Sequence, residues 1–433
     1  MQKDAFIDEF LNFLRASVTP FHAVKQMTER LAAGGFSCLD EGACWQLRPG
    51  GKYYTTRNGS SLIAFVVGTQ DPGESGLRLF GAHTDSPCLK IKPTPELLRH
   101  GCQQLAVTPY GGVLLNPWFD RDLSIAGRVV YQTPQGDLAS ALLDFERAVA
   151  SVPSLAIHLD KEANSKRSIN AQQHLPLVLG CTDSALDFRA LLARELQERC
   201  PELSVASVLD YDLSCYDTQA AARTGLDREF VVSARLDNLL SCYVGLQALQ
   251  AAPTAVTSVL VCNDHEEVGS RSAEGADGPM LQSVLRRLVG GSDELDRVLC
   301  RSLLISADNA HAIHPNYADK HDANHGPRIN QGPVIKINAN QRYASNDESS
   351  AIFRRLCDVE RVPVQAFVVR SDMGCGSTIG PITAAKLGMR TVDVGAPQWA
   401  MHSIREIAGV DDVYALYRVA RRFFALQRLA GPF

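Results

Sequence analysis

The stretch TSVLVCNDHEEVGS, residues 257–270, contains the pattern that decides the fold class of this chain. Its first half, TSVLVC, has the length and the β-branched content of a buried strand. Its second half places Asp264, His265, Glu266 and Glu267 in succession. Buried charges are costly unless they are paired or bind a metal. Acidic residues that directly follow a buried strand therefore need a chemical reason.

Six further apolar runs share the character of that strand. They are SLIAFVVG (61–68), LRLFGAHTD (77–85), FVVSARLDN (230–238), SLLISADNA (302–310), VQAFVVRSD (364–372) and TVDVGAP (391–397). Helical patterns separate several of these runs, for example at 239–251 and 281–289, and two amphipathic helices are expected within residues 3–34. Strands that alternate with helices form sheets that are covered on both faces. The sequence therefore predicts an α/β fold.

Residues 91–229 differ in character from the rest of the chain. They are rich in Pro, Gln, Thr and Asp, with turn signals such as Thr94-Pro95 and with short strand candidates, GRVVYQ and LAIHLD. We interpret this segment as an inserted domain. Residues 1–90 and 230–433 would then form one discontinuous domain around it.

The composition is that of an ordinary globular protein. Of the 433 residues, 45% are hydrophobic, which is enough for a sizeable core. The net charge of -5 and the lack of long Lys/Arg runs argue against nucleic acid or an anionic membrane as a partner. The opening stretch, MQKDAFIDEFLNFLRAS, matches neither a secretory signal nor a membrane span. The twelve cysteines form no C-x-x-C pair, so we expect a cytoplasmic protein with reduced thiols.

Residues suited to metal binding follow five of the apolar runs. They are His83 with Asp85, Asp237, Glu266 with Glu267, Asp308, and His402. Ligand sites in α/β sheets lie outside the carboxyl ends of the strands, so one fold would bring these side chains together. Imidazole and carboxylate ligands without thiolate suit zinc, cobalt or manganese, and five ligands exceed one tetrahedral zinc site. The pattern predicts two divalent metal ions that share a carboxylate.

The adjacent pair of Glu266 and Glu267 has a chemical reason in such a site. Neighbouring residues at a strand end point to different sides, so one carboxylate can bind a metal while the other faces the bound water as a general base. Two metal ions about 3.5 to 4 Å apart would lower the pKa of a bridging water, polarise a carbonyl and hold a free amine. These are the tasks of an aminopeptidase.

Each motif has a simpler explanation when it is taken alone. The H-x-D motif of His83 and Asp85 can be a turn with a local hydrogen bond, and paired glutamates are common at helix starts. Asp237 and Asp308, each followed by Asn, can be helix caps or Asx-turns, and His402 can be a structural histidine. Five such endings in one chain favour a metal site over independent coincidences.

Several motifs resemble, in the same order, those of the aspartyl aminopeptidase family of dinuclear zinc exopeptidases. They are GAHTDSPCLKIKP, SARLDNLLSCY, CNDHEEVGS, ISADNAHAIHPNY, GPVIKINANQRYAS, CGSTIGP and GAPQWAMHSIRE. The resemblance extends over nearly the whole chain. It implies a catalytic α/β/α domain with a central mixed sheet, formed by both ends of the chain. It also implies a β-rich inserted lid and dimerisation domain, and assembly as a tetrahedral homododecamer.

The resemblance also implies a role for each residue of the site. The implied ligands are His83 and Asp308 for one zinc ion, Glu267 and His402 for the other, and Asp237 as the bridge. Asp85 would orient His83, as metal-bound imidazoles usually require. Glu266 would be the general base, taking a proton from the water that attacks the first peptide carbonyl and returning it to the leaving amine.

Two further residues would select the substrate. Lys336 lies in the apolar pattern GPVIKIN, where a buried ammonium would need an anionic partner. Alternatively, Lys336 lies on the solvent side of an edge strand. The resemblance implies that Lys336 binds the side-chain carboxylate of the substrate and that Tyr343, in QRYAS, helps to hold the substrate near the metals. The implied substrates are peptides with a free N-terminal Asp or Glu.

His158, in the strand candidate SLAIHLD, is the last candidate residue. Alone it would be a structural histidine, whereas the resemblance of LAIHL to a family motif implies that it reaches the active site of a neighbouring subunit. One departure from the family precedes Cys375, where members often have Pro and this chain has Met373-Gly374. This departure leaves the stringency for acidic residues open.

Two other functions are alternatives. The same metal centre would serve a general aminopeptidase or an amide deacylase, from which Lys336 would distinguish this protein. The other alternative is a non-catalytic shell, in which the metal ions only hold the domains together. A structural zinc site needs no spare base, so Glu266 argues against the shell.

Overall fold

The computed structural model describes residues 2–429, which fall into two compact units. The first unit consists of the described residues of Met1–Ser86, Ala221–Met401 and Glu406–Phe433, and the second consists of Pro87–Ala220 with His402–Arg405. The chain therefore enters the second unit just before the predicted position 91. It returns before position 229, because β11 (Ala222–Thr224) pairs with β12 (Phe230–Ser233) of the first unit.

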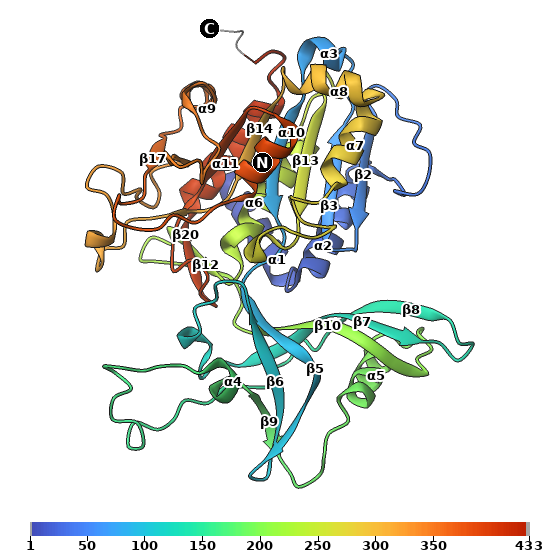
Figure 1. The fold of residues 1–433 in the computed structure, drawn as a ribbon, viewed down its shortest axis with the longest axis vertical. Coiled ribbons are helices and arrows are strands. Elements are labelled where there is room, and N and C mark those ends of the chain that lie inside the picture. The colour runs from blue at the N-terminus through green and yellow to red at the C-terminus, as the bar shows by residue number, and fades with distance from the viewer. Residues whose placement is uncertain (1, 430–433) are drawn as a thin grey trace. The chain divides into compact units, whose positions relative to one another are not determined.

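The first unit is built on a mixed nine-stranded sheet (Figure 1). In spatial order its strands are β1 (Ser37–Cys38), β2 (Lys52–Arg57), β3 (Ser61–Val66), β13 (Ser258–Asn263), β4 (Arg78–His83), β14 (Leu303–Ala307), β18 (Thr391–Gly395), β16 (Val334–Lys336) and β17 (Gln365–Phe367). Strands β13, β4, β14 and β18 are parallel neighbours. Strands β3 and β16 run antiparallel beside them. The predicted α/β fold with a central mixed sheet is confirmed.

Helices cover both faces of this sheet because successive strand residues point to opposite sides. On one face, Phe80 and Leu260 belong to a core shared with α1 (Lys3–Ala16), α2 (Pro20–Ala33), α6 (Leu236–Gln250), α9 (Asp347–Glu360) and α11 (Val410–Phe424). On the other face, Leu79 and Val259 belong to a core shared with α7 (Met280–Val289), α8 (Ser292–Leu299) and the end of α10 (Ile379–Leu387). The parallel strands are thus buried on both sides, and polar side chains gather at their ends.

The two amino-terminal helices form as predicted, and they hold α6 in place. Thr19 caps α2 by accepting a hydrogen bond from the backbone N–H of His22, and Pro20 follows at the first helical position. From α1, the rings of Phe6, Phe10 and Phe13 lie 5.1 to 5.4 Å from the ring of Tyr243 in α6. This aromatic packing fixes the helix that carries Asp237 in its first turn.

A second sheet of five strands also belongs to the first unit. Its order is β11, β12, β20 (Glu406–Gly409), β19 (Pro397–Trp399) and β15 (Ala310–His311). The first part of the apolar run at 230–238 therefore belongs to this smaller sheet, which the sequence pattern did not distinguish from the larger one. Strand β12 delivers the chain to α6 and hence to Asp237.

The second unit is an antiparallel six-stranded sheet with helix α5 (Phe188–Arg199) packed on it through Phe188, Leu192 and Leu196. Its strands are β8 (Leu138–Asp144), β7 (Leu123–Gln132), β10 (Ser207–Asp217), β5 (Cys88–Arg99), β6 (Cys102–Tyr110) and β9 (Leu177–Cys181), and α4 (Ala171–His174) precedes β9. GRVVYQ lies in β7, as predicted. Within residues 2–429, no helix combines the length and apolar character needed to cross a membrane.

The prediction of a strand at LAIHLD is wrong. Residues 155–160 form an irregular segment with a turn, and the alternation of apolar side chains has no buried face. Leu155, Ile157 and Leu159 are 59%, 48% and 74% exposed, respectively. The pattern has the period of a strand, but no neighbouring strand pairs with it.

Candidate metal centre

Three strand ends of the nine-stranded sheet carry most of the predicted ligands. His83 is the last residue of β4, Asp308 directly follows β14, and Glu266 follows β13 after a short turn. Because β13, β4 and β14 are parallel, these carboxyl ends meet at one edge of the sheet. Asp237 comes from the start of α6. The ends of these strands and the start of α6 therefore place these side chains close together.

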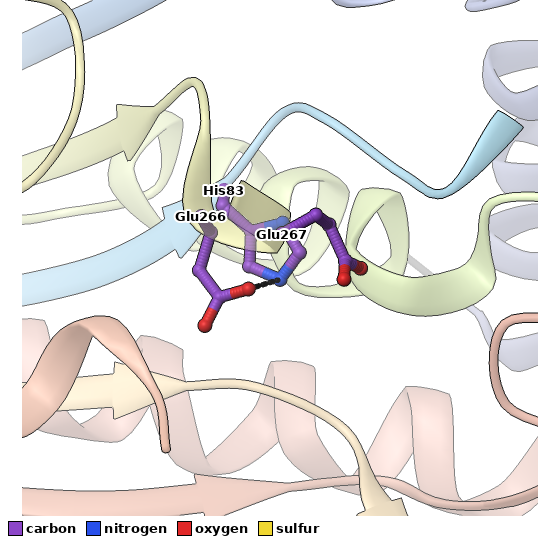
Figure 2. A group of neighbouring side chains, drawn as sticks. All are labelled: His83, Glu266 and Glu267. Atoms are coloured by element: carbon purple, nitrogen blue, oxygen red, sulfur yellow. Dashed lines mark ion pairs between the residues drawn. The ribbon is translucent and has the colours of Figure 1, made fainter. Parts of the chain in front are cut away.

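His83 lies at the centre of this cluster. Its Nε2 atom is 3.4 Å from Oδ1 of Asp237, 3.7 Å from Oδ1 of Asp308 and 4.0 Å from Oε2 of Glu266. Figure 2 shows the carboxylates of Glu266 and Glu267 on either side of the His83 ring. Two groups, His83 with Asp237 and Asp308, and His83 with the two glutamates, each offer ligand atoms within 4.8 Å of one another.

Asp85 organises both His83 and the glutamate pair. The Nδ1 atom of His83 lies 3.0 Å from the backbone oxygen of Asp85 and 3.3 Å from its Oδ1. A carbonyl oxygen only accepts, so Nδ1 carries the proton and Nε2 is the atom that faces the carboxylates. The backbone N–H groups of Glu266 and Glu267 donate to Oδ1 and Oδ2 of Asp85, each at 3.1 Å.

The sequence pattern predicted the glutamate pair at an extended strand end, but the pair does not lie on a strand. Glu266–Val268 form one 3₁₀ turn, which follows His265 in the left-handed region at a φ of 64°. The backbone reverses there, and Asp85 accepts hydrogen bonds from the first two N–H groups of the turn. The two carboxylates still diverge, but the turn and not strand alternation separates them.

Two asparagines that the sequence analysis did not assign a function tie the ligand loops together. Asn238 donates from Nδ2 to the backbone oxygen of Ala307 at 2.8 Å, and Asn309 donates to that of Leu236 at 2.9 Å. Each asparagine therefore donates to the backbone just before the aspartate of the other Asp-Asn pair, whereas an Asx-turn would bond locally. The repeated Asp-Asn pattern after two apolar runs was the available signal. The peptide bond between Asp237 and Asn238 is cis.

The site concentrates acidic groups in a place that water barely reaches. Burial raises the pKa of Glu266 to about 8 and raises the pKa of Glu267 well above its usual range, and neighbouring carboxylates add to both effects. Burial alone would lower the pKa of His83, but hydrogen bonds with Asp237 and other carboxylates raise it well above its usual value.

This donor set fits a divalent metal. Buried carboxylates around one imidazole repel one another, and a divalent cation among them would offset that repulsion. Imidazole nitrogen and carboxylate oxygen are ligands that zinc, cobalt and manganese accept. His83, Asp237 and Asp308 have the burial and the mutual distances required of ligands to one ion.

Lys336 lies in the interior, not at an edge. Its strand, β16, runs between β18 and β17, and the residue is 2% exposed, so the edge-strand alternative is wrong. Its Nζ atom lies 3.0 Å from Oδ2 of Asp308, 3.1 Å from the backbone oxygen of Asn309 and 5.0 Å from the ring centroid of Tyr343. The anionic partner that a buried ammonium needs is thus supplied by Asp308 of the same chain.

Tyr343 lines a cavity of about 320 Å³. Phe367, Trp399, His311 and Cys375 also line it, together with the Met373-Gly374 departure noted above. Burial, with the neighbouring Cys375, raises the pKa of Tyr343, so its hydroxyl keeps its proton. The cavity combines aromatic walls with polar side chains, among them Lys320, Arg370 and Gln398, a mixture that is found in small-molecule sites. Phe367 and Trp399 had no signal in the sequence, since aromatic residues in short strands are usually core.

The remaining candidates, His402 and His158, lie in the second unit. The Nδ1 atom of His402 lies 3.1 Å from the backbone oxygen of Gly112, and the backbone N–H of Leu114 donates to the oxygen of His402 at 3.0 Å. His158 is exposed in the turn at residues 157–159. The role of His402 as a metal ligand and that of His158 at a neighbouring site stay predictions.

Known proteins are similar to this chain in sequence and fold. The family described as aminopeptidase I zinc metalloprotease (M18) matches residues 13–424. A probable M18 family aminopeptidase 2 of Pseudomonas fluorescens (strain SBW25) is 58% identical over 425 residues, covering 98% of this chain and 99% of the relative. The corresponding protein of Pseudomonas putida (strain GB-1) is 58% identical over 429 residues, covering 99% and 100%.

Solved structures agree with these relatives. A chain in the cryo-EM structure of the Ape4 and Nbr1 complex has a TM-score of 0.94 and 37% identity, covering 98% of this chain and 86% of that chain. The S. cerevisiae mApe1 dodecamer has a TM-score of 0.85 and 29% identity, covering 98% and 96%.

Proposed function

This chain belongs to the M18 family of aminopeptidase I zinc metalloproteases, and from that premise we propose that it removes N-terminal Asp or Glu from peptides at a two-metal centre. The metallo-aminopeptidase function follows from the family. The observation that supports the proposed site is the buried cluster of His83, Asp237 and Asp308 beside the glutamate pair.

We assign the metal ligands as the family resemblance implies. His83 and Asp308 would hold one zinc ion, Glu267 and His402 the second, and Asp237 would bridge them. When bound, two such ions would lower the pKa of a water molecule and polarise the substrate carbonyl. Asp85 accepts hydrogen bonds from Nδ1 of His83 and from the backbone of the glutamate turn, and these bonds orient both groups.

Glu266 is the proposed general base. Its carboxylate faces Nε2 of His83 while its backbone N–H is held by Asp85. A carboxylate fixed in this way can take a proton from the attacking water at Oε2 and deliver it to the leaving amine. The side chain of Glu267 points away from that of Glu266 (Figure 2), which suits Glu267 to binding a metal ion.

Lys336 and Tyr343 support the preference for acidic substrates. An ammonium group has three N–H donors, and Asp308 and the backbone oxygen of Asn309 accept two from Lys336. We propose that the third donates to the carboxylate of the substrate beside Tyr343, whose ring lies 5.0 Å from Nζ. The cavity that Tyr343 lines offers room for further parts of the peptide.

We also propose assembly into a homododecamer in which His158 acts on a neighbouring subunit. Three exposed apolar side chains, Leu155, Ile157 and Leu159, surround His158 in the sequence, and exposed apolar patches of this kind mark contact surfaces. The mApe1 structure, a relative by fold, is a dodecamer. The second unit would then serve as the lid and dimerisation domain.

The test is hydrolysis by protein that has been stripped with a chelator and resupplied with zinc, cobalt or manganese. Peptides that begin with Asp, Glu or Leu are compared with an N-acetylated Asp peptide. Metal-dependent release of Asp and Glu, with slow release of Leu and an inert blocked peptide, is expected. Equal release of Leu would favour a general aminopeptidase, and cleavage of the blocked peptide would favour a deacylase. Intact oligomer that stays inactive with every metal would favour the non-catalytic shell.

A further inference from the structure

Two cysteines of the second unit lie opposite each other on neighbouring strands. Cys102 opens β6 and Cys181 closes β9, which is the edge strand of the six-stranded sheet. The two residues are partners in the strand register, and their Sγ atoms are 3.5 Å apart. Cys181 is exposed and Cys102 is partly exposed. Both thiols can therefore be reached from solvent.

The backbone around this pair already has the geometry that a disulfide needs. The N–H of Thr182 donates to the oxygen of Gly101 at 2.9 Å, so the flanking pair is the hydrogen-bonded one and Cys102 faces Cys181 at a non-hydrogen-bonded position. Cα atoms at such positions lie about 4.5 Å apart, and disulfides accept Cα separations of about 4.4 to 6.8 Å. Rotation of the two side chains would suffice to join the sulfur atoms.

Other neighbouring cysteines lack this access. Cys242 and Cys262 interact through their side chains, but both are buried in the main core of the first unit. Cys88 lies near Cys215, which is also buried, and burial raises the pKa of the Cys215 thiol well above its usual value. A buried thiol is shielded from an oxidant in the solvent and is therefore inert.

We propose that Cys102 and Cys181 are a redox-sensitive pair that hydrogen peroxide converts into an intrachain disulfide. The exposed Cys181 attacks peroxide, so that the O–O bond breaks, an S–O bond forms, and a sulfenic acid and one water result. The thiol of Cys102 then attacks the sulfur of Cys181, an S–S bond forms, and the S–O bond breaks with release of a second water. Two thiols and one peroxide thus give one disulfide and two waters.

The disulfide would act on the edge of the sheet. Strand β9 pairs only with β6 among the strands of its sheet, and an edge strand opens more easily than a central one. A covalent link between the end of β9 and the start of β6 would hold that edge closed. This inference does not depend on the proposed peptidase function.

The experiment compares full-length protein treated with hydrogen peroxide and protein treated with dithiothreitol. Each sample is alkylated, digested with trypsin and examined by mass spectrometry. Peptides 100–121 and 168–189 each contain one cysteine, Cys102 and Cys181. Peroxide is expected to join these two peptides and to remove two alkylation sites, and non-reducing electrophoresis is expected to show a monomer band.

Variants make the assignment specific. Cys102→Ser and Cys181→Ser should each abolish the linked peptide, whereas Cys200→Ser, a control in the same unit, should keep it. Hydrogen exchange in Leu177–Cys181 should be slower in the oxidised protein. Separate oxidation of both cysteines without a link, a link between different chains, or a linked peptide that persists in either serine variant would overturn the proposal.

Discussion

The ammonium of Lys336 lies 3.0 Å from Oδ2 of Asp308, and the two residues are 2% and 8% exposed. Removal of one partner of a buried ion pair strongly destabilises the protein, because the other charge is left unpaired. Lys336 and Asp308 therefore depend on each other. Asp308 is also a proposed metal ligand. The group proposed to recognise the substrate therefore holds a ligand of the metal that performs the reaction.

We expect Lys336→Met to have two effects. The value of kcat/KM for an Asp peptide should fall about 10- to 100-fold more than for the isosteric Asn peptide, because only the carboxylate loses a charge-assisted contact. The affinity for zinc should also fall, since Asp308 loses the donor that orients it. Kinetics on the two peptides and metal analysis after dialysis provide the measurements.

Lys25→Met is the matched control, since Lys25 is an exposed lysine of α2 that does not line the cavity at Tyr343. It should leave both quantities near those of the parent. A Lys336→Met enzyme that loses the same factor on both peptides would contradict the role in substrate choice, and unchanged zinc affinity would contradict the coupling through Asp308.

Glu266→Gln should lower kcat about 10²- to 10⁴-fold, the usual contribution of a general base, while the metal content stays that of the parent. Glu267→Gln should lower the metal content itself, because it removes a proposed ligand. The two variants differ by one position in the same turn, so metal analysis and kcat together separate base from ligand. Substantial turnover by Glu266→Gln would refute the assignment of the base.

His158→Ala should impair catalysis only through the neighbouring subunit. In oligomers mixed from His158→Ala and Glu266→Gln chains, some sites combine an intact Glu266 with an intact His158 from the other chain, so activity should exceed that of either variant alone. His100→Ala, at another exposed histidine of the second unit, should behave like the parent. Mixing that restores nothing would argue against action between subunits.

Stability should fall in mild acid because of His22. Burial lowers the pKa of His22 from 6.5 to about 4, and Lys25 and Arg235 add to the shift. The folded protein therefore holds this proton less tightly than the unfolded chain. The contribution of His22 to stability is fully present above pH 6.5 and declines as the pH falls towards 4. The loss attributable to His22 should be about 2 kcal/mol near pH 5.

Thermal unfolding of the parent and of His22→Gln at neutral and mildly acidic pH measures this effect. The Tm difference between the two proteins should shift in favour of the variant as the pH falls, whereas an exposed-site control, His100→Gln, should track the parent. A difference that does not change with pH would contradict the prediction.

Local sequence patterns were sufficient for most strands of the central sheet and for the place where their polar ends meet. The apolar runs predicted β3, β4, β13, β14 and β18, because a strand buried on both faces has a continuous apolar stretch that no surface loop shares. The polar residues that end those runs predicted where His83, Asp308 and the glutamate pair would meet, because parallel strands end at one edge.

Tertiary structure alone decided features that depend on partners distant in the sequence. The partner of Lys336 is 28 residues away, directly after strand β14 of the same sheet, and Asp85 reaches the glutamate turn across 181 residues. The apolar alternation around His158 looked like a strand but has no strand to pair with, since hydrogen-bonded neighbours make a strand and periodicity alone does not. Residue types and their spacing determined which chemistry this chain can support. The packing of the sheet determined which charges became pairs, because burial makes an unpaired charge costly only once the fold has excluded water.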